Sequence, residues 1–152
     1  MNLKKILLGI TMFATLFTSY AQEKKVEIKD NKILINGVVA LKYEKISSIE
    51  HSFYTLDDDE ILMYKYNSNE TPSYAADDYM ILNFLTLKTK IESNDVSKSL
   101  AGLGMNTKKN MEKLVTWLLK EKVINEKGEL NPERLEIFYD KYHENITDRT
   151  FR

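Results

Sequence analysis

The chain has 152 residues, with 22 Lys and Arg against 23 Asp and Glu, a formal net charge of −1 and no cysteine. This length suits one domain with a single core, and the missing cysteines exclude disulfides, thiol catalysis and zinc–thiolate centres. The charge balance gives the chain no electrostatic reason to bind nucleic acid, so we expect no nucleic-acid partner.

The first residues, MNLKKILLGITMFATLFTSYAQ, have the three parts of an export signal. Lys4 and Lys5 precede an uncharged apolar run at residues 6–17. Ser19 and Ala21 then stand at the −3 and −1 positions of a cleavage site. The apolar run is shorter than the about 20 residues that span a bilayer, and no cysteine offers a lipid anchor at the cut.

We therefore expect residues 1–21 to be a cleaved signal peptide and residues 22–152 to form a single α+β domain. The protein should be exported, to the periplasm or out of the cell, with no stable membrane insertion after signal cleavage. Loss of the two signal lysines leaves 20 basic against 23 acidic residues, a net charge of −3. The arrangement resembles small exported proteins of Gram-negative bacteria, a resemblance that assigns no role to any residue.

Apolar and polar residues mostly alternate from residue 26 to residue 93, with many Ile, Val, Tyr and Phe, which predicts strands. The pairs Asp30-Asn31 and Asn36-Gly37 stand between apolar runs, where residues that tolerate positive φ form tight hairpin turns. These two pairs predict the first two turns of a meander.

The run YMILNFLTLKTKI, residues 79–91, is apolar on both faces in its first part, so we expect one central strand covered by helices. The segment before it, residues 67–79, is the longest predicted loop and holds Pro72, one of only two prolines. An exposed partner-binding loop is one interpretation of this segment.

From residue 95 onward the apolar period becomes helical. Val96, Leu100 and Leu103 predict a first helix over residues 95–103. A second helix should begin at the cap Asn106, with an apolar stripe of Met111, Leu114, Val115, Leu118 and Leu119. A third helix should begin at the cap Asn131, with Pro132 in its first turn and Leu135, Phe138, Tyr139 and Tyr142 on its apolar face. The sequence thus predicts an α+β fold: an antiparallel sheet of about five meander strands followed by about three C-terminal helices packed on one face.

The stretch NEKGELNPE, residues 125–133, looks at first like a calcium loop. Aligning Gly128 with the glycine of an EF-hand places Val123, Lys127 and Arg134 at ligand positions, where none of them can hold calcium. We interpret the stretch instead as a turn between two short extended pieces, followed by the cap of the third helix.

Two histidines are present. His51 shares a predicted strand face with Ile49 and Phe53, which indicates a histidine that is in the core or half-buried. His143 ends the third helix, where the helix dipole favours a cation. Neither has a partner at metal-ligand spacing, so we expect no metal site and no cofactor.

The candidate binding residues are tyrosines of the strand half and the long loop: Tyr54, Tyr64, Tyr66 and Tyr74. Tyrosines on an uncovered sheet face would suit stacking on a sugar or contact with a protein. Ordinary cross-strand pairing on a half-exposed sheet is the favoured explanation of these tyrosines. The acidic run Asp57, Asp58 and Asp59 is a candidate weak cation site at a hairpin tip, where aspartates also occur for turn geometry and solubility.

No catalytic residue can be assigned, because phosphate-loop, nucleophile-elbow and zinc-protease motifs are all missing. The favoured function is a non-enzymatic protein-interaction module of the cell envelope, which binds an envelope protein through its sheet and its 67–79 loop. The alternative is a small-ligand or glycan binder that uses the tyrosine-bearing sheet face. A hydrolase built from loop carboxylates is the third hypothesis.

Overall fold

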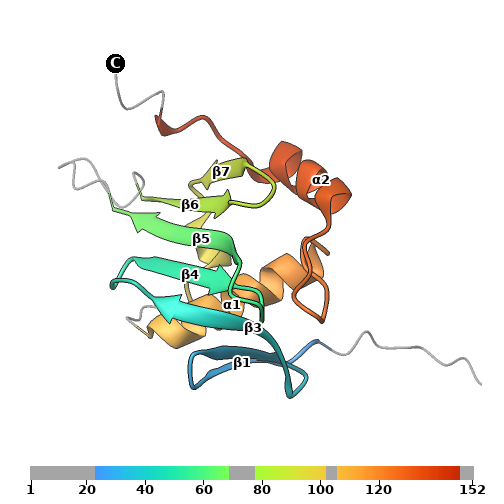
Figure 1. The fold of residues 1–152 in the computed structure, drawn as a ribbon. Coiled ribbons are helices and arrows are strands. Elements are labelled where there is room, and N and C mark those ends of the chain that lie inside the picture. Colours follow the sequence, from blue (N-terminus) through green and yellow to red (C-terminus); the bar gives the residue numbers. More distant parts are fainter. Residues whose placement is uncertain (1–22, 69–77, 102–105, 148–152) are drawn as a thin grey trace, which may run out of the picture.

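The computed structural model describes residues 23–68, 78–101 and 106–147. Over these residues the chain forms one antiparallel sheet of seven strands and two α-helices (Figure 1). Each strand pairs with its neighbour in the chain, in the order β1-β2-β3-β4-β5-β6-β7. The predicted α+β class and the meander are therefore confirmed.

The strands are β1 (Val26–Lys29), β2 (Lys32–Ile35), β3 (Val38–Lys45), β4 (Glu50–Tyr54), β5 (Glu60–Asn67), β6 (Tyr79–Phe84) and β7 (Thr89–Ser93). The helices are the 3₁₀ helix η2 (Val96–Lys98) and the α-helices α1 (Thr107–Lys120) and α2 (Pro132–Tyr142). The prediction of about five strands and about three helices is wrong in both numbers for the described residues.

The first two hairpins turn where the sequence predicts them. Asp30 and Asn31 have φ of 50° and 58°, and Asn36 and Gly37 have φ of 52° and 83°. Positive φ at both central residues is the mark of the tight turns whose twist matches that of the flanking strands. The turn residues therefore set the register of β1, β2 and β3.

The predicted central strand over residues 79–91 is wrong. The chain forms the hairpin β6–β7 there, and β7 is an outer strand of the sheet. The turn is made by Leu85 and Lys88, whose carbonyl and amide are 3.3 Å apart, with φ of 50° at Lys88. Because this turn contains two leucines and neither Gly nor Pro, its sequence continues the apolar run and conceals the break.

Both predicted caps of the α-helices are confirmed. The Asn106 side chain accepts a hydrogen bond from the Lys109 amide, and the Asn131 side chain accepts one from the Arg134 amide. The predicted helix over residues 95–103 is wrong, since only Val96–Lys98 is helical and residues 102–105 lie outside the described residues. Its first residues lack a side-chain cap.

The core lies between the sheet and α1, which passes behind the strands in Figure 1. Met111, Leu114 and Leu118 of α1 are buried against strand residues such as Phe53 and Leu82. The predicted apolar stripe of this helix is confirmed as its buried face.

The second helix is held mainly by an aromatic cluster at the end of the first. The rings of Trp117, Phe138 and Tyr142 lie with centroids 4.7–4.8 Å apart. The Arg134 guanidinium donates to the carbonyl of Glu121 from both Nε and Nη2, at 3.2 and 3.1 Å. These contacts satisfy a carbonyl at the C-terminal end of α1 and dock α2 beside β7.

Both outer strands of the sheet have backbone partners outside the sheet. On β1, the amide of Ile28 donates to the Glu112 carboxylate of α1 at 2.9 Å. On β7, the carbonyl of Glu92 accepts from the amide of Glu144 at 2.8 Å, in the segment that follows α2. Exposed edges are templates for pairing with other chains, so these contacts reduce that hazard.

The stretch at residues 125–133 is a turn, as predicted. Ile124 and Leu130 form a β-bridge, and the Asn125 side chain accepts from the amides of Lys127 and Glu129. Gly128 has φ of 81°, and a Cβ atom on it would lie 2.7 Å from the carbonyl oxygen of Ala40. The glycine is thus required by both backbone conformation and close packing on β3.

Replacing Gly128 by alanine should destabilise the protein more than the same change at Gly37. Both glycines have positive φ, which costs an alanine about 1–2 kcal/mol. Only Gly128 has close neighbours, so Gly128→Ala should cost about 2–4 kcal/mol and Gly37→Ala about 1 kcal/mol in the free energy of unfolding. Urea denaturation measures both values. Equal losses would show that the approach of this turn to β3 contributes nothing.

Candidate interaction surface

The two faces of the sheet differ because alternate side chains point to opposite sides. Phe53 of β4 pairs with Leu62 of β5, and both are buried under the helices. The next residues along, Ser52 and Met63, pair on the other side. Met63 in turn faces Asn83 of β6, so the pairing forms a continuous row across three strands.

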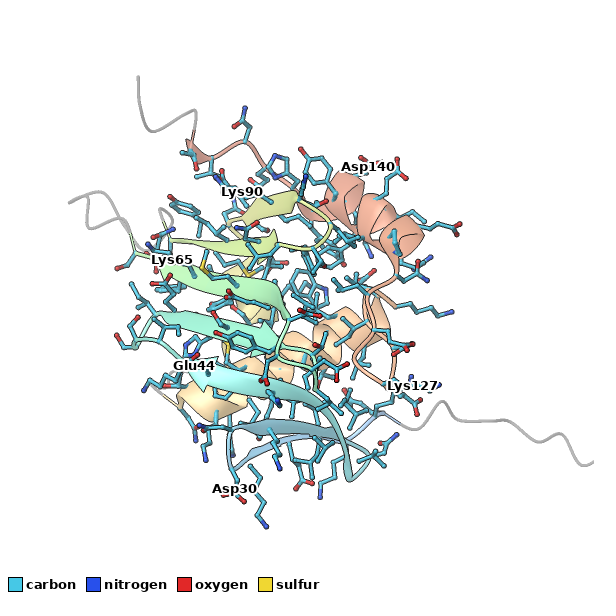
Figure 2. All side chains as sticks on the ribbon, viewed as in Figure 1. Asp30, Glu44, Lys65, Lys90, Lys127 and Asp140 are labelled. Atoms are coloured by element: carbon cyan, nitrogen blue, oxygen red, sulfur yellow. The ribbon has the colours of Figure 1, made fainter. Side chains whose placement is uncertain are left out.

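We call this second side the open face. In Figure 1 it is turned toward the viewer, and no described helix passes in front of it. Figure 2 shows its side chains over the ribbon, with Glu44, Lys65 and Lys90 labelled on β3, β5 and β7. At β7 this face is covered where residues 146–147 bond to the buried side chain of Glu92, which pairs with Ile81. Elsewhere the open face is the broad surface of the sheet that the described part of the chain leaves uncovered.

Uncharged side chains occupy the middle of the open face. We call them the open-face strip: Ser52, Tyr54, Met63, Ile81 and Asn83. Ser52 is buried among its neighbours, and the other four are half-buried. Charged residues of both signs surround the strip: Glu44, Glu50, Lys65 and Lys90.

Tyr54 is held in a fixed position on this face. Its hydroxyl donates to Oε2 of Glu44 on the adjacent strand at 2.9 Å. The bond to the carboxylate raises the pKa of the Tyr54 phenol, because an ionised phenol could not donate it. The Tyr54 ring thus lies on the open face with its hydroxyl group already hydrogen-bonded.

The other candidate tyrosines do not join Tyr54. Tyr64 is 2% exposed on the helix-covered face, where its hydroxyl lies 2.9 Å from Oγ of Ser99. Tyr66 packs on the core from the same face, and its hydroxyl donates to Asp78. The expectation that these tyrosines would share an uncovered face is wrong, because Tyr64 and Tyr66 follow the buried Leu62 at the period of a strand. Tyr74 lies outside the described residues.

The acidic run of Asp57, Asp58 and Asp59 lies in the β4–β5 turn, which is the tip of a hairpin. Asp58 has φ of 70° and its Oδ1 binds Nζ of Lys42 at 2.6 Å, while the Asp59 amide bonds to Thr55. Over the described ranges no group of three or more His, Asp or Glu side chains is arranged to hold a metal ion. A weak cation site at Asp57, Asp58 and Asp59 stays a prediction.

His51 lies in the core, as predicted, at 1% exposure. Its Nδ1 is 2.9 Å from the hydroxyl of Tyr43, whose ring stacks beside the imidazole. Burial, together with the smaller effect of the Lys45 charge, lowers the His51 pKa to about 4. With both groups enclosed, this pair is a buried polar contact rather than a reactive site.

No family model, no curated protein and no solved structure matches this chain. No helix in the described part of the chain is both long and apolar enough to cross a membrane. Function therefore has to be argued from the geometry of the chain itself.

The sequence interpretation missed Met63, Ile81 and Asn83 as surface residues. Residues 79–91 were expected to be covered on both sides, which hid the outward position of Ile81. In β6 the residues Met80, Leu82 and Phe84 are buried, and Ile81 and Asn83 between them are half-buried. Only Asn83 shows this alternation in the sequence, because Ile81 is itself apolar.

Acid should weaken folding through His51 between about pH 6.5 and pH 4. The unfolded histidine takes up a proton below about 6.5, while the folded one, with its pKa at about 4, does not. Stability is thus fully present above this window and falls as pH drops through it, by on the order of 2–3 kcal/mol. Urea unfolding as a function of pH measures the loss, and ring NMR measures the midpoint.

The matched control is His51→Asn, which keeps an acceptor for Tyr43 but does not titrate. This variant should lose the His51 component of the pH dependence. An NMR midpoint near 6.5 for His51 would contradict the burial argument.

Proposed function

We propose that the protein is a non-enzymatic interaction module of the cell envelope that binds another protein through its open face after export. The observation that carries the proposal is the open-face strip, an uncharged centre on a sheet face that no described helix covers. Export itself rests on the N-terminal signal pattern.

The composition of the face favours a protein partner. Protein interfaces have centres depleted in charge and enriched in aromatic residues and methionine, with a polar rim. Met63 and Tyr54 stand in the strip, and the rim carries both signs of charge through Glu50 and Lys65, which pair across β4 and β5. A rim of mixed charge suits a protein surface of mixed charge better than a polyanion.

The glycan-binding alternative has less support. It relied on several tyrosines on one uncovered face, and Tyr64 and Tyr66 lie on the covered one. Tyr54 remains, but its hydroxyl is occupied by Glu44. Sugar recognition combines stacking with free polar groups, so one ring with an occupied tip is a weak platform.

Photo-crosslinking tests the proposal in the cell that makes the protein. A benzophenone amino acid placed at Met63 or Ile81 should give one discrete adduct with another polypeptide. The same amino acid at Ile137, which is 52% exposed on α2, serves as the control and should not give that adduct. Equal adducts from all three positions, or none from the strip, would contradict the proposal.

A charge in the strip should weaken the complex with the crosslinked partner. Ile81→Asp places a carboxylate where the interface centre would exclude water, so we expect at least about a tenfold loss of affinity. Ile137→Asp adds the same charge on α2 and should change the affinity less than about twofold. Isothermal calorimetry compares the two variants after circular dichroism shows that both are folded.

A further inference from the structure

The chain after α2 runs along the outer edge of β7 as residues 143–147. The amide of Glu144 donates to the carbonyl of Glu92 at 2.8 Å, and the amide of Glu92 donates to Nδ1 of His143 at 3.2 Å. The amide of Asn94 donates to Oε1 of Glu144 at 3.4 Å. This segment thus supplies partners for the outward backbone groups of an edge strand, which otherwise would face solvent or another chain.

The far end of the segment is anchored on the side chain of Glu92, which is 2% exposed. Its Oε2 accepts from the amides of Ile146 and Thr147 at 3.1 and 2.8 Å, and its Oε1 accepts from the Thr147 hydroxyl. Nζ of Lys90 lies 2.5 Å from the same carboxylate. Burial raises the pKa of Glu92, but these bonds and the lysine charge outweigh it and hold the pKa at about 2.

The near end of the segment depends on the protonation state of His143. A backbone amide can only donate, so Nδ1 of His143 must carry its lone pair to accept from Glu92. The lone pair of Nδ1 is the acceptor in this bond, and the interpretation of His143 as a helix-end cation stays a prediction. A proton on Nδ1 would set two donors against each other.

We infer that His143 is an acid-sensitive latch, which holds the start of residues 143–147 on β7 while neutral and releases it when protonated. Glu92 is the second fastening, and it keeps residues 146–147 in place after the first has opened. The segment thus detaches from β7 in two separate steps.

The groups nearest His143 come from β7, from α2 and from the segment itself. From β7, Glu92 contributes a carboxylate, and Lys90 has its charge paired with that carboxylate. From α2, the Tyr139 ring stacks on the imidazole with centroids 4.4 Å apart. Glu144, the next residue in the chain, has a carboxylate that accepts from the amide of Asn94. If the protonated ring keeps its orientation, Nδ1 carries a hydrogen and cannot accept. If the ring rotates by half a turn, a carbon takes the place of Nδ1. The Glu92 amide therefore loses its acceptor in either orientation.

The two steps should occur at well-separated pH. Histidine is the side chain that usually changes charge between about pH 5 and 8. Glu92 remains ionised down to about pH 2. The Glu92 amide therefore loses its acceptor first, and residues 146–147 leave only in strong acid.

Amide hydrogen exchange of the full chain, followed by NMR, tests the latch. On protonation of His143, the protection factor of the Glu92 amide should fall at least tenfold, after correction for the pH dependence of intrinsic exchange. The Thr147 amide should keep its protection down to about pH 3. The ring signals report each titration separately, because the chain has only two histidines and the pKa of His51 is about 4.

Two variants separate the latch from a general loss of stability. His143→Asn places a non-titrating acceptor near the position of Nδ1, and should hold the Glu92 amide at both pH values. His143→Ala removes the acceptor, and should leave that amide unprotected at both, while core amides such as that of Phe53 stay protected. A wild-type Glu92 amide whose protection does not change as His143 titrates would overturn the inference. A His143→Asn variant that still opens with acid would overturn it equally.

Discussion

The backbone groups on the two outer edges of the sheet impose the constraint on which the rest of this structure depends. A meander that does not close into a barrel leaves one row of amides and carbonyls on each outer strand, and such rows attract other chains. Here one amide of the β1 row, that of Ile28, bonds to Glu112 of the first helix, and the row on β7 meets residues 143–147. Each helix therefore has a second role. The helix α1 packs in the core and bonds to β1 through Glu112, and α2 places the C-terminal segment beside β7.

The contacts on the two outer edges of the sheet determine which surface remains available to a binding partner. Strand addition is a common mode of partner binding, and it needs an accessible edge. With the contacts at Ile28 and Glu92 in place, the broad surface left by the described residues is the open face. The proposed function uses that face, and the proposed latch governs whether the Glu92 amide of the β7 edge has an acceptor.

Local chemistry made part of this fold predictable from the sequence. The turns at Asn31 and Gly37 need residues that tolerate positive φ, and the helix caps at Asn106 and Asn131 need a short side chain that accepts a backbone amide. Each of these signals lies within a few residues of the structure that it specifies.

The parts of the fold that the sequence did not predict depend on contacts between residues that are far apart in the sequence. The turn at Leu85 contains no residue that signals a turn, so β6 and β7 were merged. The period of β5 correctly placed Tyr64 on the same side as Leu62, but it does not state which side the helices cover. His143 and Glu92 are 51 residues apart, and no local pattern relates them.

The most direct measurement of the edge-closure account is native-state hydrogen exchange at the outward amides of β1 and β7 at neutral pH. The account predicts that the Ile28 and Glu92 amides are protected at least about 100-fold, because each donates to a group outside the sheet. The protection at Ile28 should be lost in Glu112→Ala while the amides of β4 and β5 keep theirs. Exchange of Ile28 and Glu92 in the wild-type protein at the rate of an unstructured chain would contradict the account.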